Sequence, residues 1–201
     1  MRIGFDFDNT IVSYDALFHK VATEQNLIND SVAANKLAVR DYLRATGREE
    51  TWVEMQGYVY GARMSEAASF PQALKVMRRL QEAGHELLIV SHKTKHPYAG
   101  EKYDLHEAAR GWLTLHLHDD QGRLIPESHT YFELTKDAKI NRIAELKCDV
   151  FIDDLPEIFL AAPFPAHTRK YLFDPDHHHT AAHLPDVNVV TSWSHFESNL
   201  L

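Results

Sequence analysis

The chain has 201 residues, of which 44% are apolar and 25% charged, as in an ordinary globular protein. This length allows one domain with a sizeable core, or a core domain that carries a small insertion. The formal net charge of −8 argues against a broad basic surface for nucleic acid or for an anionic membrane. A small anionic substrate held by a metal remains compatible with this charge.

Cysteine content and hydropathy bear on the compartment. Cys148 is the single cysteine, so no intramolecular disulfide can form, which fits a reducing compartment. The N-terminus leads directly into a predicted strand without the apolar segment of a signal peptide. No apolar run approaches the roughly 20 residues of a membrane span. We therefore expect a cytoplasmic protein with neither a membrane nor a nucleic-acid partner.

Five short apolar runs predict β-strands. The runs Leu-Leu-Ile-Val and Asp-Val-Phe-Ile are continuous rather than alternating, which is typical of parallel strands covered on both faces. The five predicted strands are residues 3–8, 86–91, 149–153, 170–173 and 187–191.

Two helices carry clear start and stop signals. The first, over residues 71–85, begins with Pro71 and ends at Gly84. The second, over residues 135–147, has Thr135 as its N-cap. Alternating helices and strands predict an α/β fold, a three-layer Rossmann-like core with a parallel sheet and right-handed crossovers.

Two segments interrupt this alternation. Residues 14–69 read as mostly helical and predict a small helical cap, with Trp52, Tyr58 and Tyr60 in its core. Residues 95–134 contain a turn, a helix and a second turn. The predicted division is a core of residues 1–13 and 70–201, in which 95–134 is a second insertion, and a cap of residues 14–69.

Acidic pairs follow two of the predicted strands. Asp6 and Asp8 lie in the sequence Phe-Asp-Phe-Asp-Asn-Thr, where carboxylates are costly to bury. The carboxyl ends of parallel strands accept them, because ligands bind there. Asp153 and Asp154 end a second apolar strand. Two such pairs side by side form an oxygen-rich site that suits Mg²⁺.

Further polar residues lie where an anion would bind. Ser91 ends a third strand, and its hydroxyl can donate to a phosphate oxygen. Lys136 and Lys139 lie in the first turn of the helix before Asp153, and a lysine there can reach an anion as a point charge. His92 and the lysine after it leave the same strand as Ser91, toward either a substrate or water.

The ordered set of motifs resembles the haloacid dehalogenase (HAD) superfamily, in its phosphatase-like branch. The resemblance covers residues 1–13 and 70–192, and its most specific part is Asp-x-Asp-x-Thr after an N-terminal strand. The superfamily's dehalogenases lack the second acid and need no metal. The presence of Asp8 therefore favours phosphoryl chemistry over dehalogenation.

The resemblance implies a role for each motif residue. Asp6 would be the nucleophile that forms an aspartyl-phosphate, and Asp8 the general acid and then the base. Lys139, preferred to Lys136, would neutralise charge on Asp6 and the phosphate. The implied phosphate-binding residues are Asn9, Thr10, Ser91 and His92. The implied Mg²⁺ ligands are Asp6, Asp8 through its backbone carbonyl, Asp153 and Asp154.

A histidine-rich stretch allows a zinc hypothesis that we weigh against a solvated loop. His177, His178 and His179 are consecutive and therefore point in different directions, and His183 has helical spacing to His179 only if that stretch is helical. We favour the loop.

The sequence thus predicts Mg²⁺-dependent hydrolysis of a small-molecule phosphomonoester through an aspartyl-phosphate. A phosphomutase or phosphotransferase would use the same residues. A catalytically silent binding domain is a second alternative, against which the intact motif residues argue. A nucleic-acid end phosphatase is a third, weakened by the charge of −8. The substrate and the oligomeric state stay open.

Overall fold

A computed structural model describes residues 1–120, 122–179, 184 and 186–200 of the chain. It divides into two compact units. The core unit comprises Met1–Val12, Ser69–Lys93 and Leu117–Leu201, and the helical unit comprises Ser13–Ala68 and Thr94–His116.

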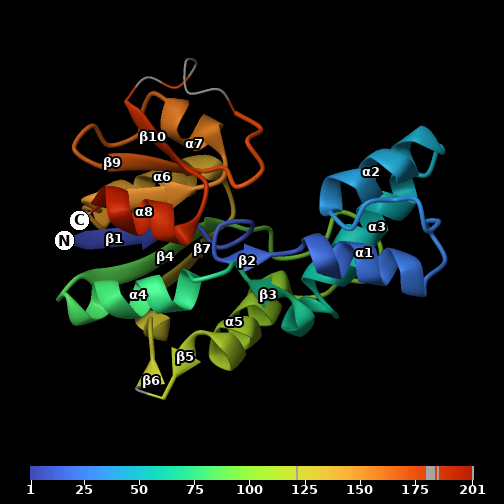
Figure 1. The fold of residues 1–201 in the computed structure, drawn as a ribbon, viewed down its shortest axis with the longest axis horizontal. Helices are drawn as coiled ribbons and strands as arrows, with labels where there is room; N and C mark the ends of the chain where they lie inside the picture. The colour runs from blue at the N-terminus through green and yellow to red at the C-terminus, as the bar shows by residue number, and fades with distance from the viewer. Residues whose placement is uncertain (121, 180–183, 185, 201) are drawn as a thin grey trace. The chain divides into compact units, whose positions relative to one another are not determined.

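A six-stranded parallel sheet forms the centre of the core unit (Figure 1). Its order is β10-β9-β8-β1-β4-β7, so the first strand of the chain lies between β8 and β4. In this register Phe5 of β1 pairs with Ile89 on one side and Ile152 on the other. The strands are β1 (Arg2–Phe5), β4 (Glu86–His92), β7 (Thr130–Glu133), β8 (Val150–Asp153), β9 (Arg169–Phe173) and β10 (Val187–Val190).

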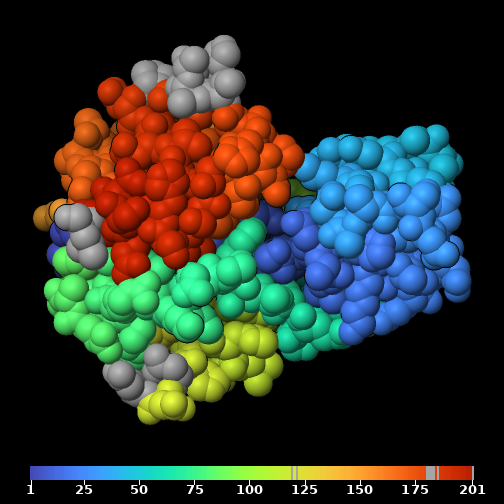
Figure 2. Space-filling model, viewed as in Figure 1, coloured from blue at the N-terminus to red at the C-terminus, as the bar shows by residue number. Residues whose placement is uncertain are grey.

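Helices cover both faces of this sheet, which confirms the expected three-layer α/β fold. Figure 1 shows α4 (Ala73–Glu82) and α8 (Trp193–Leu200) in front of the sheet and α6 (Lys136–Glu145) behind it. The short α7 (Pro156–Leu160) packs with α6 through Ile158 and Phe159. The side chains of α4 and α8 meet over the front face (Figure 2). This double cover explains why the strand sequences are continuously apolar.

Two close contacts fix β1 and the loop after it. A Cβ atom at Gly4 would lie 2.5 Å from Phe151 Cδ2, so only glycine lets that ring pack against β1. On the other face, the Trp193 ring stacks on Phe5 with centroids 5.4 Å apart. The Trp193 indole N–H donates to the backbone carbonyl of Thr10 at 3.0 Å. The loop that follows β1 is therefore held by the core.

The helical unit has its own aromatic core. Trp52 is buried and lies 5.1 Å from the Phe18 ring, and Tyr60 lies edge-on to Tyr14 at 4.8 Å. Asn35 caps α2 by accepting a hydrogen bond from the Ala38 N–H. The elements are α1 (Asp15–Glu24), α2 (Lys36–Ala45), α3 (Glu49–Tyr60), the 3₁₀ helix η1 (Met64–Glu66) and α5 (Leu105–His116).

Short elements complete the secondary structure. β2 (Val12–Ser13) pairs with β3 (Ala68–Ser69), and β5 (His118–Asp119) pairs with β6 (Gly122–Arg123). A 3₁₀ helix, η2 (Glu127–His129), precedes β7.

The expectation that residues 95–134 form one insertion in the core is wrong. Its first part, including α5, belongs to the helical unit, where the Trp112 indole N–H donates to the Ala67 carbonyl at 2.7 Å. Its last part returns to the core unit as β7, the edge strand beside β4. An edge strand pairs on one side only, so three of its four residues stay half-buried and its sequence lacks a continuous apolar run.

None of the helices in the described part of the chain has both the length and the apolar character that crossing a bilayer requires. The cytoplasmic location stays a prediction.

The packing of Trp193 gives a testable prediction for stability. We expect Trp193→Ala to lower the free energy of unfolding by about 3–5 kcal/mol, because it opens a cavity beside Phe5 and leaves the Thr10 carbonyl without its donor. Urea unfolding measures this loss. The control is Leu160→Ala, whose side chain is 55% exposed and should change the value by less than about 0.5 kcal/mol. A loss at Trp193 no larger than the control would contradict this account of the packing.

Candidate active site

The first acidic pair lies where β1 ends and the chain turns. The Asp6 N–H donates to the Ile152 carbonyl at 2.9 Å, which continues the ladder to β8 one residue beyond β1. The Phe7 carbonyl then accepts hydrogen bonds from two backbone N–H groups four and five residues on. Asn9, in this turn, has a φ of 56°, a conformation that asparagine tolerates better than most residues. Asp6 and Asp8 thus both follow the carboxyl end of the central strand.

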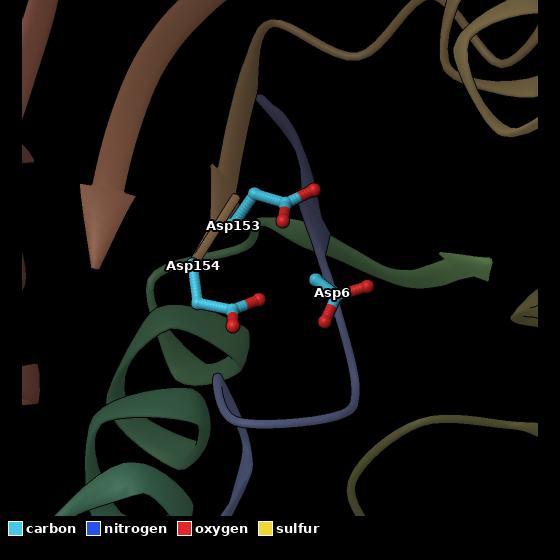
Figure 3. Close-up of side chains that lie close together, drawn as sticks. All are labelled: Asp6, Asp153 and Asp154. Carbon is cyan, nitrogen blue, oxygen red and sulfur yellow. The ribbon is translucent and has the colours of Figure 1, made fainter. Parts of the chain in front are cut away.

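Three carboxylates converge at this edge of the sheet. Asp6, Asp153 and Asp154 each offer an oxygen, and these oxygens all lie within 4.8 Å of one another (Figure 3). Asp6 follows β1, Asp153 is the last residue of the neighbouring strand β8, and Asp154 comes directly after it. Asp6 and Asp153 are buried, and Asp154 is half-buried. The structure therefore brings together one acid of the first pair, Asp6, and both acids of the second pair, as a cation site would require.

Lys139 compensates part of this negative charge. Its ammonium lies 2.6 Å from Asp6 Oδ1 and 2.6 Å from Asp153 Oδ2, and its side chain is 1% exposed. It comes from the first turn of α6, which Thr135 caps by accepting the Ala138 N–H. Lys136 instead pairs with Glu157 at the surface. Of the two candidate lysines, the structure places Lys139 at Asp6.

Burial and charge shift the ionisation of this cluster in opposite directions. Burial raises the pKa of Asp6 from its ordinary value of 3.8 to about 7, against the lowering effect of Lys139 and with further raising by Asp153 and Asp8. Burial alone would lower the pKa of Lys139, but the carboxylates of Asp153 and Asp6 outweigh it and raise that pKa. The ammonium of Lys139 therefore stays charged, and the cost of burying charge appears as the raised pKa of Asp6.

Two hydroxyl groups lie near the carboxylates. Ser91, 1% exposed at the end of β4, donates from Oγ to Asp6 Oδ1 at 2.9 Å. Thr10 is fully buried, and in the part of the chain that the structure describes its Oγ1 has no hydrogen-bond partner. A buried hydroxyl without a partner is costly, which makes Thr10 Oγ1 a candidate donor to a ligand.

His92 is the last residue of β4 and is half-buried. Burial lowers its pKa, and the charges of Lys139 and Lys136 lower it further. A neutral imidazole at this position can donate to an anion through its ring N–H without adding a charge.

Lys93 is a site residue that the sequence analysis did not assign. It was expected to face a substrate or water, but it is 5% exposed and its ammonium donates to Asp8 Oδ1 at 2.9 Å and Oδ2 at 2.7 Å. The sequence did contain a signal for this position of Lys93. Side chains two residues apart in a strand lie on the same side, so Lys93 is expected on the same side as Ser91. Ser91 in fact contacts Asp6, and Lys93 contacts Asp8.

The charges of the cluster fit a divalent cation. The ammonium groups of Lys139 and Lys93 pair with Asp6, Asp153 and Asp8. With Asp154 included, the formal charges of these four acids and two lysines sum to −2 in a largely buried site. An all-oxygen donor set of carboxylates matches a hard divalent cation rather than a soft metal, which prefers sulfur. The carboxylate of Asp8 is not part of the three-carboxylate group, and it pairs with Lys93 instead.

The histidine-rich stretch has a different arrangement. The buried carboxylate of Asp174 accepts the backbone N–H groups of His178 and His179, each at 2.8 Å. Within the described residues, His177, His178 and His179 belong to no group that could hold a metal. His183 lies outside the described residues.

Comparisons with known proteins bear on the fold of the chain. No protein-family model matches the chain. A protein of Bacillus cereus named "Putative nucleotidase" is 20% identical over 203 residues, covering 96% of this chain and 95% of that protein. A second protein with the same description, from Oceanobacillus iheyensis, is 22% identical over 79% of each chain.

Solved structures show the same architecture. A HAD family hydrolase from Deinococcus radiodurans, with bound phosphate and sodium, has a TM-score of 0.57 and 20% identity over 99% of this chain and 94% of its own. A predicted phosphoglycolate phosphatase from Haemophilus somnus has a TM-score of 0.57 and 13% identity over 100% and 97%. The chain therefore has the fold of the HAD-superfamily hydrolases, as its motifs indicated.

The raised pKa of Asp6 gives a prediction for the metal-free protein. Its folded-state pKa lies above the unfolded value, so its favourable contribution is complete below about pH 4 and is lost as the pH rises through about 7. Asp6→Asn removes this titration. We expect the variant's gain in unfolding free energy over the wild type to grow between these pH values.

Urea unfolding in EDTA across this pH range measures the difference. The matched control is Asp176→Asn, which removes an exposed carboxylate of the core unit. A difference between Asp6→Asn and the wild type that does not change with pH would contradict the assignment of the raised pKa to Asp6.

Proposed function

We propose that this chain is a phosphohydrolase that releases inorganic phosphate from a small phosphomonoester in the presence of Mg²⁺. The observation that carries the proposal is the buried ammonium of Lys139 between Asp6 and Asp153, with Asp154 beside them. A buried cluster of this kind is a poor source of stability, because desolvating its charges costs as much as their attraction returns. A functional role accounts for it better than a structural one.

The net charge of the site supports an anionic substrate together with a cation. With all six side chains ionised, their formal charges sum to −2, which would repel a phosphate group. A divalent cation at Asp6, Asp153 and Asp154 would neutralise them, with Mg²⁺ as the choice for an all-oxygen site that also receives phosphate oxygens. When bound, the cation would lower the repulsion between the substrate's phosphoryl oxygens and the attacking carboxylate.

Asp6 is the proposed nucleophile. A carboxylate oxygen of Asp6 forms a bond to phosphorus while the bond from phosphorus to the ester oxygen breaks, giving an aspartyl-phosphate and a leaving alkoxide. Ser91 and Lys139 both donate to Asp6 Oδ1, which fixes the rotation of this carboxylate. The other oxygen, Oδ2, is the one that faces the substrate in this proposal.

Asp8 is the proposed proton carrier. As an acid it gives its proton to the leaving oxygen, so that an alcohol departs. As a base it then takes a proton from water, and the water oxygen bonds to phosphorus while the bond to Asp6 breaks. Inorganic phosphate leaves, Asp6 is regenerated as a carboxylate, and Asp8 is again protonated.

The transferring phosphoryl group needs donors on its other oxygens. Thr10 Oγ1 supports this role, because it is buried and lacks a partner among the described residues. Lys139 supplies positive charge, and Asn9 and His92 lie on the turn and the strand end beside the same edge. We assign phosphate binding to these residues together with Ser91.

We further propose that the helical unit selects the substrate, as a cap would. The chain leaves the core unit for the helical unit at Ser13, soon after Thr10, and again at Thr94, directly after Lys93. Both crossings thus follow site residues in the chain. Nucleoside monophosphates belong among the candidate substrates, because the relatives found by sequence are named nucleotidases.

Phosphate release from a panel of substrates tests the proposed function. The panel contains p-nitrophenyl phosphate, sugar phosphates, nucleoside monophosphates and amino-acid phosphates, each with Mg²⁺ and with EDTA. Metal-dependent release supports the proposal. An isomerised sugar phosphate without free phosphate would identify a mutase, and no product from any member by the folded protein would contradict the proposal.

The two lysines of α6 give a matched pair of variants. Lys139→Met should lower kcat by at least about 100-fold, because the attacking carboxylate and the phosphate lose a buried cation. Lys136→Met should change kcat by less than about twofold, since Lys136 pairs with Glu157 at the surface. Steady-state kinetics on the best panel substrate measures both. Equal effects of the two changes would contradict the assignment of Lys139.

A further inference from the structure

Two side chains at the end of β4 lie opposite the two acids that follow β1. Ser91 and Lys93 are two residues apart, as are Asp6 and Asp8, and the two segments run parallel. Ser91 contacts Asp6, and Lys93 contacts Asp8. Each member of the acidic pair therefore has its own donor from the neighbouring strand.

Lys93 is held firmly at this position. Its backbone N–H donates to the Glu133 carbonyl at 2.8 Å, which extends the ladder between β4 and β7 by one residue. Its side chain is only 4% exposed, and its ammonium lies 5.6 Å from the centre of the Phe7 ring. Burying an ammonium in this way is costly unless it is paired, and its contacts with both oxygens of Asp8 supply that pairing.

Asp8 is the more exposed member of the pair, with a side chain 23% exposed at the start of a turn. A carboxylate there could rotate toward water or toward the cation site. Two hydrogen bonds from one ammonium restrict both of its side-chain torsions. Lys139 does not provide this restraint, because it is engaged by Asp6 and Asp153.

We propose that Lys93 is a positioning residue that holds the carboxyl group of Asp8 in the orientation needed to pass its proton to the leaving oxygen, with one oxygen kept on the ammonium while the other carries the proton. This inference rests on the proposed function, in which Asp8 carries that proton. Lys93 then acts through Asp8 alone and makes no contact with the substrate. Its removal should slow the chemical step and leave substrate binding nearly unchanged.

The leaving group provides the most discriminating test. Proton donation matters most for a poor leaving group, such as the alkoxide of a sugar phosphate, and least for p-nitrophenolate. Because Asp8 also acts as a base on the intermediate that both substrates share, the measured quantity is kcat/KM, which reports only the steps up to departure of the leaving group. We expect Lys93→Met to lower kcat/KM by at least about 30-fold on an alkyl phosphate and by less than about fivefold on p-nitrophenyl phosphate. A general loss of structure would lower both rates equally.

A double-mutant cycle with Asp8→Asn gives the second test. If Lys93 acts only through Asp8, then Lys93→Met should change kcat by less than about twofold in a protein that already carries Asp8→Asn. This comparison also holds if Lys93→Met alone folds poorly, because the double variant removes both members of the buried pair. Lys170→Met is the matched control, since Lys170 is a partly buried lysine on β9 that donates to the Phe159 carbonyl. The control should retain wild-type kinetics.

The outcomes separate this inference from the proposed function. A wild type inactive on every phosphomonoester overturns the proposed function and this inference with it. An active wild type whose Lys93→Met variant loses kcat/KM equally on both substrates, or shows additive effects with Asp8→Asn, overturns only the role of Lys93. A selective loss on alkyl phosphates that disappears in the Asp8→Asn background supports it.

Discussion

The buried ammonium of Lys139 is the interaction on which the rest of the site depends. It joins Asp6 at the end of β1 to Asp153 at the end of β8, and so ties the central strand to its neighbour at the edge where both end. Without a buried cation, two desolvated carboxylates this close would repel each other strongly. The position of Lys139 follows from the packing of α6. The helix packs on the sheet through Ile140 and Ile143, and this packing buries the neighbouring Lys139 as well.

The need to pair buried charges also explains why Asp6 and Asp8 have different surroundings. Four acids and two lysines share the site, and each lysine serves a different member of the first acidic pair. Asp6 is buried and held by Ser91 and Lys139, as a nucleophile with a fixed direction of attack should be. Asp8 is partly open to solvent, as a group that exchanges protons with a substrate and with water should be. Burial and pairing, rather than residue type, distinguish the two carboxylates.

The sequence alone predicted the sheet, because doubly covered strands such as Leu87–Val90 are continuously apolar, and it predicted the acidic pairs from their place after those strands. It did not predict β7, an edge strand with mixed burial, or the assignment of α5 to the helical unit, because both depend on contacts between distant segments. Lys136 and Lys139 could not be separated by spacing, since it is their contacts that distinguish them: Lys139 is buried against Asp6 and Asp153, and Lys136 pairs with Glu157 at the surface. The contact of Lys93 with Asp8 was likewise not predicted, although the two-residue spacing of Lys93 from Ser91 was visible in the sequence.

Detection of phosphorylated Asp6 is the most direct test of the central claim that this carboxylate attacks phosphorus. The protein would be mixed with its best substrate and Mg²⁺, quenched rapidly with acid, digested, and the peptide containing residues 2–20 analysed by mass spectrometry. The account predicts a phosphoryl group on Asp6 that appears during turnover and is missing from Asp6→Asn. Turnover without any phosphorylated peptide at the shortest quench times, or with the phosphoryl group on another residue, would contradict it.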